Sequence, residues 1–252
     1  MTPYILVTND DGVTAPGILA LARAMQPFGE VGVIAPARNQ SASGHKKTMH
    51  QDMRVSTVTM FDGQTSATAV EGASPADCIA LAALGVVQWP PQLVVSGINR
   101  GANMGQDITY SGTATAALEA TIQGVPAIAF SLDNHEANTV EDYAEAARIA
   151  AQVVQTILTK TLPPFTILNV NMPPGPVKGL RLTRQGIRIY ADALQREGDR
   201  CQIVGDFPGG LTDEEGTDLW ALHRGYASIT PIHLDMTAHR FLADLAAWEI
   251  GS

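Results

Sequence analysis

Short apolar runs rich in β-branched residues alternate along the chain with longer segments rich in alanine and leucine. The short runs have the length of strands and the longer ones the composition and length of helices, so the pattern predicts the two in alternation. This alternation is typical of a mostly parallel sheet with helices on both faces, an α/β fold with a doubly wound, three-layer αβα core. The predicted strands are residues 4–7, 31–35, 93–96, 127–131 and 166–170, and the predicted helices are residues 16–25, 74–84, 112–123 and 141–158.

The pattern of apolar and polar residues changes after the segment MPPGP at residues 172–176. Strand-sized pieces follow, separated by glycine, proline and charged residues, with no long helix until residues 237–248. We therefore predict two parts, a core domain at residues 1–176 and a β-rich extension of hairpins and a C-terminal helix at residues 177–252. An extension with so little core of its own is expected to pack on the main domain or on another subunit.

Composition excludes several classes of function. With 45% apolar and 16% charged residues the chain reads as an ordinary globular protein, and a net charge of −9 argues against binding of a nucleic-acid polymer. No apolar run reaches the ~18 residues of a membrane span and no signal-peptide pattern opens the chain, so we expect no membrane partner and a cytoplasmic location. Cys78 and Cys201 form no CxxC pair, which gives no sign of a disulfide framework or a thiolate zinc site.

The segment TNDDG at residues 8–12 places two carboxylates, Asp10 and Asp11, directly after the first predicted strand. Ligands bind at this end of the strands in doubly wound sheets. Neighbouring carboxylates repel, so they need a cation, a partner base or solvent. One interpretation is an ordinary turn with an Asp helix cap. The other is a site for a hard divalent cation, Mg²⁺ or Mn²⁺, with Ser41 and Asn99 from other polar loops as neutral oxygen ligands.

A second feature is the segment SGINRGANMGQDITYSGTATAALEA, which begins at residue 96 and carries glycines at 97, 101, 105 and 112. We predict a long loop whose backbone N–H groups face a ligand and which closes at the start of a helix. A helix N-terminus with unpaired N–H groups and hydroxyls suits a phosphate, although Ser111 as a plain helix cap is the alternative. The predicted phosphate contacts are Asn99, Gly101, Ser111, Gly112 and Thr113.

Other phosphate and hydrolase motifs fail on spacing. The segment SGHKKT ends like a Walker A motif but lacks its glycines, and neither G-x-G-x-x-G nor G-x-S-x-G follows a predicted strand. The six histidines show no metal-ligand spacing, and only His45 lies in a predicted site loop, where it is a weak candidate for a general acid.

Five motifs in order along the chain resemble the SurE family of survival protein E nucleotidases. They are ILVTNDDG near the N-terminus, P-x-R-N-Q-S-A-S-G at 36–44, SGIN-x-G-x-N-x-G-x-D-x-x-YSGT at 96–113, NVN-x-P at 169–173, and GYASITP with D-x-T at 225–237. The resemblance implies a Rossmann-like core and a metal-dependent phosphatase acting on nucleoside 5′- and often 3′-monophosphates. It also implies a C-terminal extension exchanged between subunits, hence a homodimer or homotetramer.

The family's metal ligands fall on Asp10, Asp11, Ser41 and Asn99, the same set reached from oxygen-ligand chemistry. We therefore predict one Mg²⁺ or Mn²⁺ ion that activates a water for attack on phosphorus, with Asp10 or Asp11 as proton acceptor. Two alternatives remain at this point. One is a phosphatase of another substrate, such as short polyphosphate or a sugar phosphate, and the other is a non-catalytic nucleotide-binding module.

Overall fold

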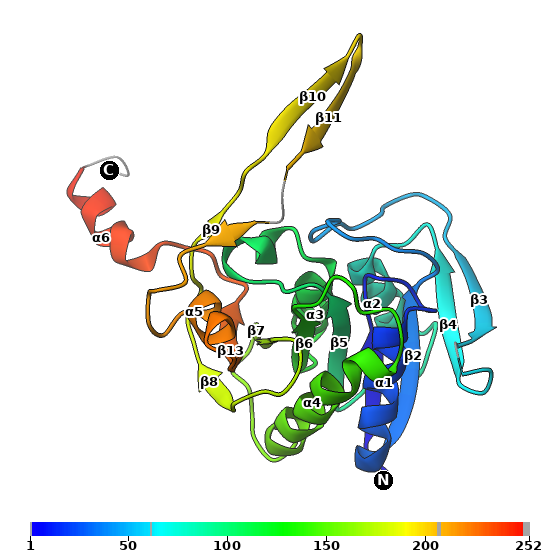
Figure 1. Ribbon diagram of the computed structural model, residues 1–252. Helices are drawn as coiled ribbons and strands as arrows, with labels where there is room; N and C mark the ends of the chain where they lie inside the picture. Colours follow the sequence, from blue (N-terminus) through cyan, green and yellow to red (C-terminus); the bar gives the residue numbers. More distant parts are fainter. Residues whose placement is uncertain (1, 61, 206–207, 249–252) are drawn as a thin grey trace.

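The computed structural model describes residues 2–60, 62–205 and 208–248 of the 252-residue chain (Figure 1). The first part of the chain forms β1 (Tyr4–Thr8), α1 (Pro16–Met25), η1 (Gln26–Phe28), β2 (Glu30–Pro36), β3 (Arg54–Thr59), β4 (Ser66–Glu71), α2 (Pro75–Ala83), β5 (Leu93–Arg100), η2 (Gly105–Thr109), α3 (Gly112–Ile122), β6 (Ala127–Leu132), η3 (Glu141–Tyr143), α4 (Ala144–Ile157) and β7 (Thr166–Met172). The rest forms β8 (Leu180–Leu182), β9 (Arg188–Ile189), β10 (Ala193–Glu197), β11 (Arg200–Val204), β12 (Gly209–Gly210), α5 (Asp218–His223), β13 (Ala227–His233) and α6 (His239–Ala247).

The main sheet confirms the predicted α/β class. Within the described residues it has nine strands in the order β3-β4-β2-β1-β5-β6-β7-β13-β8. The six strands from β4 to β7 in this order are parallel, while β3 pairs antiparallel with β4 and β13 antiparallel with β7. The chain runs from β1 to β2 on one side and later returns to β5 on the other. This makes the carboxyl ends of β1 and β5 the switch point at which such sheets bind ligands.

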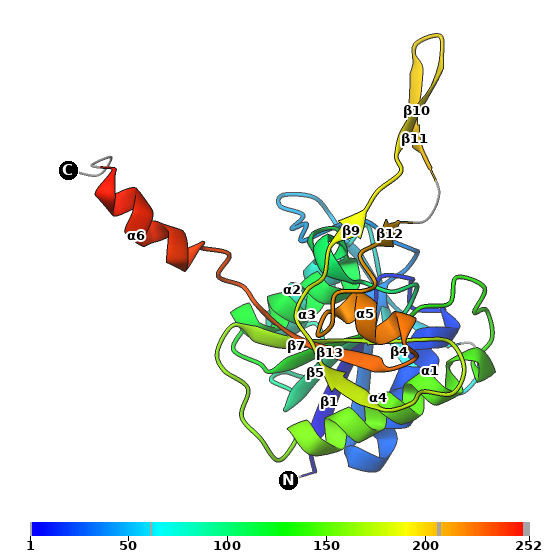
Figure 2. The same ribbon diagram turned by 60° about the vertical axis from the view of Figure 1, so that its left-hand side comes forward.

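Two hydrophobic layers lie on opposite faces of this sheet. In β1, Ile5 and Val7 belong to the cluster under α1 and α4, whereas Tyr4 and Leu6 belong to the cluster under α2 and α3. Successive side chains of a strand point to opposite faces, so a strand covered on both sides must be apolar at every position. This explains the unbroken run YILV and the helix pairs on the two faces (Figures 1 and 2).

Two parts of the core differ from the prediction. The strands β3 and β4, between the predicted elements at 31–35 and 74–84, extend one edge of the sheet. The predicted long loop after residue 96 is instead the continuation of β5 to Arg100, followed by the short helix η2. The pairing of β5 with β6 shifts register between Ser96 and Asn99, and a Cβ at Gly97 would collide with the carbonyl of Phe130. The glycines that suggested a loop therefore allow an irregular strand.

Part of the segment beyond residue 177 belongs to the main sheet, and part of it projects from the body. Both β8 and β13 lie in the main sheet, so the sheet itself does not end at the predicted boundary. The hairpin β10–β11 and the helix α6 instead project away from the body in both views (Figures 1 and 2). The division into parts of separate function at residue 177 stays a prediction. Among the described residues, no helix has both the length and the apolar character that crossing a bilayer requires.

Candidate active site at the switch point

The predicted metal ligands come together in one cleft at the carboxyl ends of β1, β2 and β5. This cleft has a volume of about 710 Å³, and Asp10, Asp11, Ser41 and Asn99 all line it. The loops that carry them are tied to one another by backbone bonds, such as that from the Gln40 N–H to the Asp10 carbonyl at 2.7 Å. Residues far apart in the sequence thus converge on a space large enough for a small ligand.

Asp10 is held against the start of α3. Its side chain is 3% exposed, and both of its oxygens accept hydrogen bonds from Thr113. The Thr113 hydroxyl donates to Oδ1 at 2.6 Å, and the Thr113 N–H donates to Oδ2 at 3.1 Å. A Cβ on Gly112 would lie 2.8 Å from the Cβ of Asp10, so only glycine allows this approach. Burial raises the pKa of Asp10, and the hydrogen bonds from Thr113 oppose that rise.

Asp11 faces the end of β5. Its Oδ2 accepts from the Arg100 N–H at 2.9 Å, and its Oδ1 accepts from the Asn39 amide at 3.4 Å. Burial, followed by the charge of Asp10, raises the pKa of Asp11 to about 6. Neither aspartate forms a salt bridge with a described residue. The pair therefore concentrates negative charge that a cation in the cleft would stabilise.

The two predicted neutral ligands, Asn99 and Ser41, line the same cleft. Asn99 is 9% exposed and its amide nitrogen donates to the Gly101 carbonyl at 2.8 Å, which assigns its Oδ1 as the atom left to accept. Ser41 is exposed, and its backbone N–H donates to the Asn39 Oδ1 at 2.7 Å, which orders the loop without engaging the hydroxyl. Two carboxylates, one amide oxygen and one hydroxyl form a donor set that suits Mg²⁺ or Mn²⁺.

This donor set differs from a histidine- or cysteine-rich metal centre. The described residues hold no group of three or more His, Cys, Asp or Glu side chains arranged to bind a metal ion. Any cation at Asp10 and Asp11 therefore depends on neutral oxygens for the rest of its protein ligands. That requirement favours a hard cation which also keeps several waters.

Only some of the predicted phosphate contacts line the cleft. Gly101 and Ser111 line the cleft, whereas Gly112 and Thr113 are not among its lining residues. The N–H and the hydroxyl of Thr113 both donate to Asp10, so Thr113 supports that carboxylate instead of contacting a ligand in the cleft. Ser111 caps α3, since its Oγ accepts from the Ala114 N–H at 3.0 Å, yet its own hydroxyl proton stays available to a ligand.

The expectation that backbone N–H groups after Asn99 face a ligand is wrong for five of the groups in that segment. Each of them donates within the protein, to a side chain or to a neighbouring strand. The acceptors are Asp11 for residue 100, Leu132 for residue 101, Asn171 for residue 103, Asp107 for residue 104 and Asp218 for residue 105. A buried segment must satisfy its backbone donors, and here the protein does so itself.

Basic side chains in the cleft were missed by sequence reasoning. Arg100, His135 and Arg188 line it, and the His135 ring lies against Gly101. The place of Arg100 beside Asn99 at a strand end was a usable signal, but nothing local marks Arg188, which comes from β9. His45, the weak general-acid candidate, does not line the cleft and instead bonds to the carboxylate of Glu119 at 3.0 Å.

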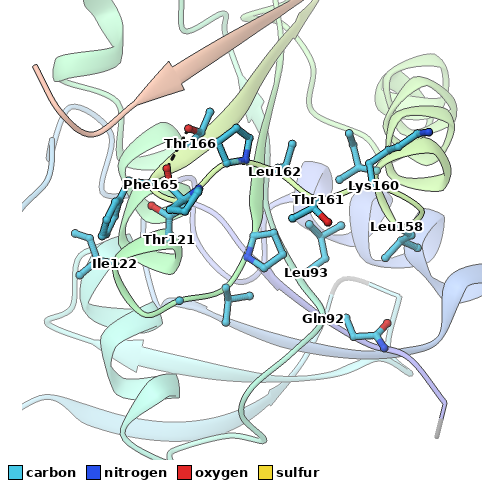
Figure 3. Close-up of a pocket in the computed structure, with 16 residues that line it drawn as sticks. Gln92, Leu93, Thr121, Ile122, Leu158, Lys160, Thr161, Leu162, Phe165 and Thr166 are labelled. Atoms are coloured by element: carbon cyan, nitrogen blue, oxygen red, sulfur yellow. Dashed lines mark hydrogen bonds between the residues drawn. The ribbon is translucent and has the colours of Figure 1, made fainter.

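A second cavity of about 670 Å³ lies at the opposite end of the strands (Figure 3). Its lining includes Leu93 and Thr166, which begin β5 and β7, and an exposed aromatic residue, Phe165. Ligands of doubly wound sheets bind at the carboxyl ends of the strands. The cleft at Asp10 and Asp11 is therefore the better candidate for an active site.

Comparison with known proteins gives concordant results. A model of the family "Survival protein SurE" matches residues 5–192. The 5′-nucleotidase SurE of Syntrophotalea carbinolica is 44% identical over 98% of this chain and 97% of its own length. The 5′-nucleotidase SurE 1 of Thermus thermophilus is 46% identical over 96% of each chain. The crystal structure of the SurE protein from Aquifex aeolicus has a TM-score of 0.83 and 37% identity, covering 98% of this chain and all of that one.

Proposed function

The chain belongs to the SurE family, and from that membership we propose that it is a metal-dependent 5′-nucleotidase. It hydrolyses nucleoside 5′-monophosphates to nucleoside and phosphate, with 3′-monophosphates as further substrates. Relatives similar over nearly their whole length bear the name 5′-nucleotidase SurE, which supports the activity.

The observation that carries the metal assignment is the convergence of Asp10, Asp11, Ser41 and Asn99 on one cleft. These four side chains would hold one Mg²⁺ or Mn²⁺ ion. When bound, that ion would supply charge stabilisation for phosphoryl oxygens and make a water more acidic. Thr113 and the Arg100 N–H fix the two carboxylates, so their positions are set before any ligand arrives.

The remaining roles are divided among residues of the same cleft. Asp11 is the better acceptor for the proton of the attacking water, because its carboxyl is the more exposed and both Asp10 oxygens are engaged by Thr113. The Ser111 hydroxyl and the exposed Arg100 guanidinium are donors that can reach a phosphate in the cleft. They would stabilise the negative charge that phosphoryl transfer spreads over the equatorial oxygens.

For the extension we propose contacts between copies of this chain, giving a homodimer or homotetramer. None of the described residues of α6 is buried. Phe241 and Leu242 in the helix are 42% and 50% exposed, and Trp248, which directly follows it, is 60% exposed. Exposed apolar side chains on an amphipathic helix are stabilised when a partner covers them. A second copy of the chain is the partner that is always present. Light scattering tests this, because a mass near the 26.7 kDa of one chain would exclude the assembly.

The activity is tested by phosphate release from a panel of substrates. The panel contains nucleoside 5′- and 3′-monophosphates, ribose 5-phosphate and tripolyphosphate, each with Mg²⁺, with Mn²⁺ and with chelator. We expect the nucleotides to be hydrolysed with metal only, and Asp11→Asn to abolish the reaction. The matched control is Asp133→Asn, which removes another carboxylate of the cleft from outside the proposed ligand set.

The same panel, together with a calorimetric titration of one nucleotide, separates the alternatives. Faster release from tripolyphosphate than from any nucleotide would identify a phosphatase of another substrate. Nucleotide binding without phosphate release under every metal condition would identify a binding module instead.

A further inference from the structure

Two tyrosine rings from distant parts of the chain contact each other beside the cleft, and one of them, Tyr110, lines it. Tyr110, which directly follows η2 and precedes Ser111, lines the cleft and is 59% exposed. Tyr190 follows β9 and is 38% exposed. The ring centroids are 6.5 Å apart and the ring planes make an angle of 87°. The rings therefore form an aromatic corner, Tyr110 with Tyr190, and leave aromatic surface open to solvent.

The corner is held in place by an ion pair between the extension and η2. The Tyr190 hydroxyl donates to Asp107 Oδ1 at 2.7 Å, and Arg188 Nε donates to Asp107 Oδ2 at 2.6 Å. The Arg188 side chain is 12% exposed, and its Nη1 also donates to the Pro208 carbonyl at 2.9 Å. A second contact joins the Arg188 N–H to Gln106 Oε1 at 2.7 Å. The Tyr190 ring is thus fixed by hydrogen bonds rather than by burial.

The position of the corner matches the chemistry of a nucleotide. The carboxylates Asp10 and Asp11 and the Ser111 hydroxyl give one region of the cleft a polar lining, and the Tyr110 ring belongs to the residue next to Ser111. A nucleoside monophosphate likewise joins a phosphate, through a sugar, to a flat aromatic base. Tyrosine faces stack well on any base, because every base presents a π-face.

We propose that Tyr110 and Tyr190 form the nucleobase subsite of this cleft, with the base stacked on Tyr110 and the Tyr190 ring bounding it at a right angle. This inference rests on the proposed nucleotidase function. Asp107 carries two of the bonds that position Tyr190 and Arg188, so it acts as a positioning residue. Because stacking is tolerant of base identity, the subsite distinguishes nucleotides from phosphate esters without a base, and purines from pyrimidines only by ring size.

The test compares a nucleotide with the same sugar phosphate lacking a base. For each variant, kcat/KM is measured on a purine nucleoside 5′-monophosphate and on ribose 5-phosphate, and the ratio of the two is the readout. We expect Tyr110→Ala to lower this ratio by about 5- to 100-fold, chiefly through KM. Tyr110→Phe, which keeps the ring, should restore most of it.

The matched control is Phe165→Ala, which removes an exposed ring (47% exposed) beside the cavity at the other end of the sheet (Figure 3). It should leave the ratio unchanged. An equal loss on both substrates by Tyr110→Ala, or an unchanged ratio, would overturn the subsite. If the wild-type protein hydrolyses neither substrate, the proposed function fails instead. In that case the subsite is tested by calorimetric titration of each variant with the nucleotide. The proposal requires that Tyr110→Ala binds the nucleotide more weakly than Phe165→Ala does.

Discussion

The hydroxyl of Thr113 offers the sharpest test of how the cleft is organised. It is fully buried and donates at 2.6 Å to Asp10, itself 3% exposed. Thr113→Val keeps the shape of the side chain and removes only this donor. A hydrogen bond to a charged group contributes about 1.5–3 kcal/mol, so we expect the free energy of unfolding to fall by about that amount. In a protein of this size that corresponds to a Tm lower by about 3–12 °C.

The same substitution should also weaken cation binding at the proposed metal site. Loss of a partner that orients a metal ligand typically weakens metal affinity or activity by about 10- to 100-fold. We expect Thr113→Val to raise the Mn²⁺ concentration for half-maximal phosphate release by a factor in that range. Thr113→Ser is the matched control, since it keeps the hydroxyl and loses a buried methyl, which costs stability but not metal affinity.

The assay is phosphate release over a Mn²⁺ titration, at a temperature where circular dichroism shows both variants folded. A folded Thr113→Val protein with wild-type Mn²⁺ dependence would refute the reasoning, because Asp10 would then need no orienting partner. A Thr113→Ser protein with the same weakened metal response would assign the effect to packing rather than to the hydrogen bond.

Three further predictions concern the same cleft. Asp11→Asn should abolish turnover, and near wild-type kcat at saturating Mn²⁺ would contradict the assignment of Asp11 as a ligand. The Tm of the metal-free variant should stay the same or rise, because burial and the neighbouring charge of Asp10 raise the pKa of Asp11 and so disfavour its ionised form. Asn99→Ala should raise the metal concentration for half activity about tenfold or more, and an unchanged requirement would remove Asn99 from the ligand set. Ser111→Ala should lower activity on every phosphomonoester by a similar factor, so a loss confined to one nucleobase would argue against a phosphate contact.

The fold was largely predictable because both signals behind it are local. The unbroken apolar run of β1 shows that both its faces are covered, and the alanine-rich helices repeat at the spacing of a doubly wound sheet. The strand β3 was not predictable in this way, since four of its six residues are polar or charged and its side chains are mostly exposed. Its pairing with β4 at the sheet edge is a tertiary contact, and such contacts leave no periodic signal in one strand.

The candidate site was most readily predictable where its residues lie at strand ends. Asp11 and Asn99 could be found because they follow predicted strands, and strand ends converge in this class of fold. Arg188 could not, because its place in the cleft depends on an ion pair with Asp107, 81 residues earlier in the chain. Sequence reasoning also assigned Thr113 to the ligand, whereas the structure gives its donors to Asp10. Hydroxyls at a helix start attract either an external anion or an internal one, and their residue type does not distinguish the two.

The structure gives a physical reason for two adjacent carboxylates after β1. Asp10 turns toward the start of α3, and Asp11 turns toward the end of β5. The Thr113 N–H of α3 donates to Asp10, and the Arg100 N–H of β5 donates to Asp11. Hydrogen-bond donors on two sides therefore offset the repulsion between the two carboxylates. Both side chains nevertheless line the same cleft. A single acidic residue, or two separated along a helix, would leave one side of a cation there without a charged ligand. Adjacency at a strand end is thus the feature of the sequence that builds the proposed metal site.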